Sequence, residues 1–174
     1  MNYYQWRAFA RDLTITCAGS LAMGLLLAMA ADVALPKRAH AGSARALIEH
    51  EAETTIGTRV LWARGMTNGC KANLLGFYNT QTQQIVMCES NISDVPEMLE
   101  ILKHETWHAA QFMCNGGQSV LTDEQIRIGL RHSDRSVMRT SYPSGQHRLE
   151  AEARTVSQLP TPNFLRGLRR YCAA

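Results

Sequence analysis

One stretch of the chain, residues 93–117, carries the signals of a long helix with defined ends. It begins with Ser93-Asp94, whose side chains can accept hydrogen bonds from the free amides of a first turn, and Pro96 suits that turn. After Cys114 it stops at Asn115-Gly-Gly, a sequence that favours helix termination. The rest of the chain must therefore be arranged around a helix that ends at about Cys114.

Inside this helix lies the motif His104-Glu-Thr-Trp-His108. Side chains four residues apart share one face of a helix, so both imidazoles can reach a single metal ion. Glu105 lies beside them and could take a proton from an attacking water and later deliver it to a leaving amine. Apolar side chains are expected to pack around the motif: Met98, Ile101, Leu102 and Phe112. The alternative is a pair of surface histidines on an amphipathic helix. Because burying two unliganded histidines and a glutamate is costly, the motif instead predicts a metal site, with Zn²⁺ as the cofactor.

A catalytic zinc ion usually has three protein ligands, so a further residue is needed. The His-x-x-Gly-x-x-His continuation is absent after His108, and the third ligand must come from elsewhere. A later helix, predicted for residues 146–159, offers Glu150 and Glu152. Two positions apart on a helix, these carboxylates cannot both point at the metal. On spacing alone, the third ligand is either Glu150 or Glu152.

These two segments resemble the gluzincin metallopeptidases, in which a glutamate from a later helix joins the HExxH histidines on zinc. The resemblance covers only two short parts of the chain. It implies a zincin-like domain and a zinc metalloendopeptidase that hydrolyses peptide or protein substrates. The site residues that it implies are His104, His108 and Glu150 as zinc ligands and Glu105 as the catalytic residue.

One position departs from this resemblance. Many relatives place an aspartate, which orients a zinc-bound histidine, where this chain has Arg154. The orienting role would then pass to Glu152, to Gln111 or to a backbone carbonyl. Tyr142 and His147 have suitable chemistry to stabilise an oxyanion, but an ordinary packing or surface position is the favoured interpretation for each.

The segment before the long helix carries strand signals. Residues 58–64 are rich in β-branched and aromatic side chains, residues 65–72 are typical of a loop, and residues 76–88 predict a hairpin with a polar turn. This hairpin also resembles the edge strand along which gluzincins hold an extended peptide. Shorter helices are expected in residues 43–57, 122–132 and 163–171. The predicted fold class is α+β: a short antiparallel sheet, then the motif helix and further helices.

The first 41 residues predict an export segment. The run from Leu13 to Ala31 is uncharged and apolar, and Ala39-His-Ala41 offers a cleavage site for a signal peptide. An uncleaved membrane anchor is the alternative, because the run approaches the roughly 20 residues that cross a bilayer. Membrane contact would then be limited to residues 13–35. Residues 42–174 are expected to form one extracytoplasmic domain, either secreted or periplasmic, or anchored at the membrane.

Four cysteines fall within this expected domain, and an even number in an exported protein predicts two disulfides. Four cysteines allow three pairings. We favour Cys70 with Cys88, because this pair brackets the predicted hairpin, and therefore Cys114 with Cys172.

The charge of the chain argues against nucleic acid as a partner. The formal net charge is +3, and the part that follows residue 41 is nearly neutral. The main alternative to a peptidase is a metal-binding but non-catalytic exported protein stabilised by disulfides, and an intact Glu105 argues against it. A third possibility is an exported disulfide-stabilised protein that binds no metal.

Overall fold

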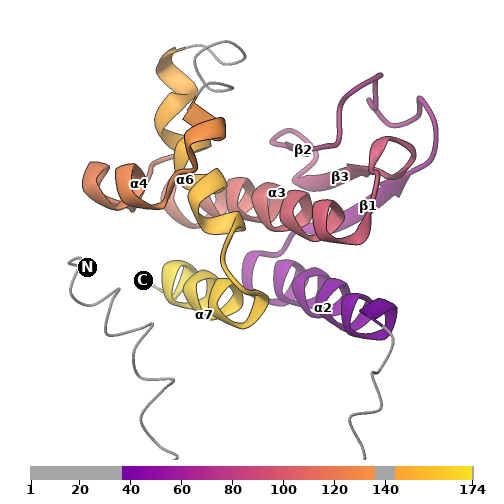
Figure 1. Ribbon diagram of the computed structural model, residues 1–174, viewed down its shortest axis with the longest axis horizontal. Coiled ribbons are helices and arrows are strands. Elements are labelled where there is room, and N and C mark those ends of the chain that lie inside the picture. The colour runs from indigo at the N-terminus through magenta and orange to yellow at the C-terminus, as the bar shows by residue number, and fades with distance from the viewer. Residues whose placement is uncertain (1–36, 136–143, 174) are drawn as a thin grey trace, which may run out of the picture. The chain divides into compact units, whose positions relative to one another are not determined.

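The computed structural model describes residues 37–135 and 144–173, which combine helices with one small sheet (Figure 1). The predicted α+β class is confirmed at this level. The elements are α2 (Lys37–Glu51), the π-helical turn η1 (Ala52–Ile56), β1 (Arg59–Ala63), β2 (Gly76–Asn79), β3 (Gln84–Cys88), the short 3-10 turn η2 (Glu89–Asn91), α3 (Val95–Asn115), α4 (Asp123–Gly129), the short 3-10 turn η3 (Ser144–Gln146), α6 (His147–Ser157) and α7 (Thr161–Cys172).

The predicted export segment falls almost entirely outside the described residues. Only residues 37–41 belong to the structure described here, where they form the beginning of α2. Within the described ranges, none of the helices combines the length and the apolar character that a bilayer crossing requires.

Helix α3 has the ends that its sequence predicts. The Asp94 carboxylate accepts a hydrogen bond from the Glu97 amide at 2.8 Å, and the Glu97 carboxylate accepts one from the Ser93 amide at 2.7 Å. At the other end Gly116 adopts a left-handed conformation, with φ of 58°, and the Gly117 amide donates to the Gln111 carbonyl. These caps place the whole HExxH motif in the interior of one uninterrupted helix.

The sheet is mixed, which corrects the predicted antiparallel sheet. Strands β2 and β3 form the expected antiparallel hairpin, but β1 pairs in parallel with β3, and the strand order is β1-β3-β2. The connection through residues 64–75 is long enough to pass over the end of β3, so β2 is added on the far side of that strand. Strand β2 is consequently an edge strand.

Both predicted disulfides are present. Cys70 is bonded to Cys88, which joins the connection between β1 and β2 to the end of β3. Cys114 is bonded to Cys172, which joins the last turn of α3 to the last turn of α7. Two disulfides are consistent with the expected extracytoplasmic location.

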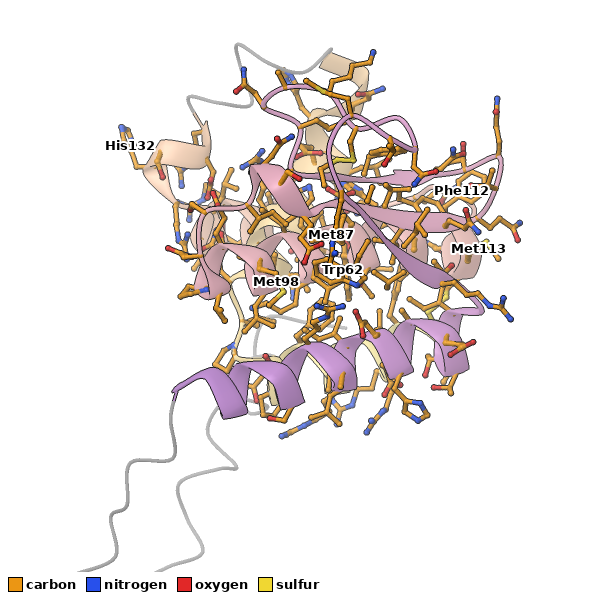
Figure 2. All side chains as sticks on the ribbon, turned by 90° about the vertical axis from the view of Figure 1, so that its right-hand side faces the viewer. Trp62, Met87, Met98, Phe112, Met113 and His132 are labelled. Atoms are coloured by element: carbon orange, nitrogen blue, oxygen red, sulfur yellow. A yellow bond between two sulfur atoms is a disulfide. The ribbon has the colours of Figure 1, made fainter. Side chains whose placement is uncertain are left out.

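Helix α3 lies at the centre of the described domain. Figure 1 shows the sheet on one side of it and α2 and α7 on the other, and α6 also packs against it. Ile48, Leu102 and Phe164 are fully buried, and so is Met87, labelled near the centre of Figure 2. Because α3 is held by neighbours on several sides, its polar motif residues have defined surroundings.

Two shorter helices differ from their predicted bounds. Helix α2 begins earlier than expected, at Lys37, and its continuation η1 ends at Ile56, where Gly57, with φ of 78°, follows as the cap. Helix α4 stops at Gly129 because Leu130 is already extended, so it is shorter than the predicted segment 122–132.

Candidate metal centre

Three of the predicted site residues meet between α3 and α6. The Nε2 atoms of His104 and His108 are 3.1 Å apart. Glu150 spans both, with Oε1 3.1 Å from His104 Nε2 and Oε2 3.1 Å from His108 Nε2. Residues distant in sequence thus place three potential ligand atoms around one point.

The donor set fits a metal ion. In a tetrahedral zinc site with bonds near 2.1 Å, neighbouring ligand atoms are about 3.4 Å apart, close to the separations in this cluster. The Glu150 side chain is only 7% exposed, and its Oε1 is buried without a hydrogen-bond partner that has good geometry. Two imidazole nitrogens and a carboxylate this close together are stabilised by a positive charge among them, which a proton or a metal ion can supply. The cluster could therefore hold a metal ion.

The electrostatics of the cluster also favour a cation. Burial acts to raise the pKa of Glu150, but the hydrogen bonds and charges of His104 and His108 outweigh it and hold this pKa far below its usual range. Burial similarly opposes protonation of His108, while Glu150 and Glu105 raise the His108 pKa above its usual value. When no metal is bound, a proton shared with Glu150 meets the need for positive charge, and a divalent ion would replace that proton.

Gln111 orients one of the histidines. Its Nε2 donates to the Leu149 carbonyl at 3.1 Å, so its Oε1 faces Nδ1 of His108, 2.8 Å away. Since Oε1 is an acceptor, Nδ1 carries the hydrogen, and this tautomer leaves the Nε2 lone pair of His108 directed at the cluster. Gln111 is 2% exposed and serves the orienting role for which the sequence offered three candidates.

Removing this contact should weaken metal binding. We expect Gln111→Leu to lower the affinity for Zn²⁺ by roughly 10- to 100-fold, because the His108 ring loses its fixed tautomer and orientation. Gln111→Glu keeps an acceptor for Nδ1 of His108, so its affinity for Zn²⁺ should fall less. Competition with a chromogenic chelator measures both affinities, and Gln118→Leu, an exposed change beyond the end of α3, is the matched control. An unchanged affinity in Gln111→Leu would contradict this role.

Glu152, the alternative third ligand, points away from the cluster. Its carboxylate accepts hydrogen bonds from the Val120 amide at 3.1 Å and from Nε1 of Trp107 at 3.2 Å. The side chain is fully buried, and burial raises its pKa. Trp107 in turn stacks on Tyr171 of α7, with ring centroids 5.0 Å apart. Glu152 therefore joins α6 to α3 and to the segment after α3.

Arg154 contacts the outer side of the Glu150 carboxylate. Its Nε lies 3.2 Å from Oε1 of Glu150, and its Nη1 lies 3.3 Å from Oδ1 of Asp134. Asp134 also accepts a hydrogen bond from the side chain of Gln158. The position that departs from the gluzincin resemblance thus forms an ion-pair network behind Glu150.

A cleft of about 420 Å³ opens onto the cluster. Glu105 lines it next to the two histidines and is 8% exposed. Strand β2 forms the opposite wall, and a Cβ atom built on Gly76 would lie 3.3 Å from Cγ of Glu105. A side chain at residue 76 would be tightly packed against α3, so glycine suits the close approach of the β2 backbone to this helix.

Among the described residues, no strand pairs with the outer edge of β2, which borders this cleft. The Cys88 amide donates to the Leu75 carbonyl, so the backbone groups of residue 75, and in alternation those of 77 and 79, face β3. The N–H and C=O groups of Gly76 and Tyr78 consequently face away from β3, and both residues line the cleft. The edge can pair with an extended chain.

The remaining predicted residues have no described position in the cleft. Tyr142 lies outside the described residues, and His147 is not among the described residues that line the cleft, although its neighbours Gln146 and Leu149 are. Phe112, expected to pack in the core, is 42% exposed and also lines the cleft. The sequence did contain a signal for this position in the cleft: Phe112 follows His108 by four residues, and that spacing places both side chains on the same face of α3.

Comparisons with protein-family models, with characterised proteins and with solved structures find no match for this chain.

Proposed function

We propose that this protein is a zinc-dependent metalloendopeptidase with a zincin-like fold that acts outside the cytoplasm. One observation carries the proposal: a His-His-Glu cluster that could hold a metal ion, an additional carboxylate and the outer edge of a strand share one cleft. His104, His108 and Glu150 would hold the ion. The resemblance to gluzincins, limited to two segments, supports the same assignment.

Glu105 would be the general base. A bound Zn²⁺ polarises a peptide carbonyl and lowers the pKa of an attacking water to about 7. Glu105 belongs to the cleft wall but not to the three-atom cluster, which leaves its carboxylate free to accept a proton from that water. The same group would then donate the proton to the leaving amine. Burial of Glu105 limits competition from bulk water during these transfers.

Strand β2 would hold the substrate in an extended conformation. The N–H and C=O groups of Gly76 and Tyr78, which face away from β3, can form main-chain hydrogen bonds with a peptide of any sequence. The close approach of Gly76 to Glu105 would keep the paired peptide beside the base. This arrangement supports a peptide bond as the reacting group rather than a small polar ester.

Metal content is the first measurement. We expect the purified protein to contain about one zinc ion per chain, and Glu150→Gln or the double variant His104→Ala/His108→Ala to contain essentially none, because the two ligands left in the first and the one left in the second cannot retain the ion. Glu152→Gln keeps an acceptor for the Val120 amide and should retain zinc. Elemental analysis of dialysed protein gives the stoichiometry, and cleavage of a fluorescent casein with and without a chelator gives the activity.

The outcomes separate the competing functions. Zinc together with chelator-sensitive cleavage supports the peptidase. Zinc without cleavage of any protein or peptide would favour the non-catalytic metal-binding protein. If the folded protein took up no metal, the peptidase and the non-catalytic metal-binding protein would both be eliminated. The remaining candidate would be a disulfide-stabilised exported protein that binds no metal.

A side chain at Gly76 should disturb the base. The Cβ atom of Gly76→Ala would lie 3.1 Å from the Val86 carbonyl oxygen and 3.2 Å from Cγ2 of Ile101 as well as close to Glu105. Such overpacking typically costs about 1–3 kcal/mol and moves the neighbouring groups. We expect kcat/KM to fall about tenfold or more, since a misplaced catalytic group is costly, while zinc content stays at the wild-type level. Gly145→Ala, where an added Cβ meets no atom within 4 Å, is the control.

A further inference from the structure

The cleft has an apolar side beyond the metal cluster. Phe112 from α3, Tyr78 from β2 and Leu149 from α6 all line it. The ring centroids of Tyr78 and Phe112 are 5.9 Å apart, and the two ring planes are tilted by 55°. Phe112 and Met113, both labelled in Figure 2, are neighbours on α3, but only Phe112 lines the cleft. A large aromatic side chain that stays 42% exposed inside a cleft offers an unfilled contact surface.

The charged groups of the described cleft are those of the metal centre and the base. Apart from His104, Glu105, His108 and Glu150, the described lining residues are uncharged. A charged substrate side chain would therefore find no opposite charge beyond the reacting groups, and would have to give up water. The lining is suited to an apolar side chain.

The outer edge of β2 determines where such a side chain would lie. The added Cβ of Gly76 faces Ile101 and Glu105, so this face of the strand is directed at α3. Tyr78 is two residues further on and faces the same way, toward Phe112. Paired residues of neighbouring strands place their side chains on the same face of a sheet. A peptide residue paired with Tyr78 would thus direct its side chain at Phe112. The peptide residue paired with Gly76 would lie two positions away along the peptide, next to Glu105.

We infer that this cleft is a specificity site that binds a large apolar side chain of an extended peptide, within two residues of the bond to be cleaved. The inference rests on the proposed peptidase function for the cleavage, but the binding step does not require it. The aromatic ring of Phe112 is the specificity-determining group, with Tyr78 beside it. The substrates are accordingly extended segments that carry aromatic or large aliphatic residues.

Binding is tested without turnover. The probes are two short capped peptides of threonine and glutamine residues that differ at one central position, phenylalanine in one and aspartate in the other. The protein is the zinc-loaded Glu105→Gln variant, which should not cleave the peptides during the measurement. Calorimetry gives the dissociation constants. We expect the phenylalanine peptide to bind about tenfold more tightly, the lower end of the discrimination that apolar contacts give.

Two further substitutions assign that preference to Phe112. When Phe112→Ser is added to Glu105→Gln, the ratio of the two peptides' dissociation constants should fall to about threefold or less, because most of the apolar contact is lost. Phe112→Leu should preserve most of it. Met113→Ser, its exposed neighbour outside the cleft, should leave the difference unchanged.

Cleavage by the wild-type protein separates this inference from the proposed function. Cleavage within two residues of the phenylalanine, with a preference for that peptide that is lost in Phe112→Ser, supports both the specificity site and the peptidase function. Cleavage without preference, or with a preference that Phe112→Ser leaves intact, overturns the specificity site and leaves the peptidase. A Phe112-dependent binding preference with no cleavage of either peptide supports the site and overturns the peptidase.

Discussion

Replacement of Glu105 with glutamine should stop peptide hydrolysis while leaving the metal in place. We expect kcat to fall by roughly a thousandfold, within the range that a positioned general base contributes. Glutamine has the same shape but cannot accept a proton from the attacking water. The proposed ligand atoms belong to His104, His108 and Glu150, so the zinc content should remain that of the wild type. Kinetics on a quenched fluorescent peptide, with zinc measured in the same samples, provide the test.

A second glutamate of the same helix serves as the control. Glu100 lies on α3, pairs with Arg131 on the surface and has a side chain that is 41% exposed. Glu100→Gln should change kcat by less than about threefold, because exposed ion pairs contribute little. If Glu105→Gln instead retained activity within tenfold of the wild type, the base would have to be another group. If it lost its zinc, Glu105 would be acting as a ligand.

Local sequence signals were sufficient to predict the helix that carries the motif. Asp94 as the cap, Pro96 in the first turn and Gly116 after the last turn are interactions between residues close in sequence. Their strength depends little on the rest of the fold. The placement of His104 and His108 on one face follows directly from this helix, and so does their short Nε2 separation.

Which of the two glutamates faces the histidines could not be derived from spacing alone. Both Glu150 and Glu152 are buried in α6, so neither burial nor periodicity separates them. The difference arises from tertiary partners. Trp107 and the Val120 amide occupy the Glu152 carboxylate, and this rotation of α6 leaves Glu150 facing the histidines.

The sheet order and the exposure of Phe112 likewise depend on long-range packing. Strand signals in residues 58–64 and 76–88 predict strands and a hairpin, but they contain no information on which side of β3 the strand β1 is added. Phe112 is apolar and was expected in the core. It reaches the cleft because it follows His108 by one turn and the neighbouring wall is formed by β2, a relation that only the folded chain defines.

Loss of the Cys114–Cys172 disulfide should reduce the stability of the protein more than loss of the Cys70–Cys88 disulfide. The bond joins residues 58 positions apart, and closing a loop of that length in the unfolded chain contributes about 4 kcal/mol. It also anchors α7, which packs against α3 and whose Tyr171 stacks on Trp107. We expect urea unfolding of Cys114→Ala/Cys172→Ala to show a decrease of about this size in the free energy of unfolding.

The other disulfide should affect substrate binding more than its smaller contribution to stability suggests. Cys70 and Cys88 are 18 positions apart, so the entropic term is about 3 kcal/mol. Their bond holds the connection that leads into β2, the edge proposed to pair with the peptide. In conditions where both double variants are folded, Cys70→Ala/Cys88→Ala should raise KM several-fold with little change in zinc content, whereas Cys114→Ala/Cys172→Ala should leave KM near the wild-type value. Equal effects on KM would mean that β2 does not position the substrate.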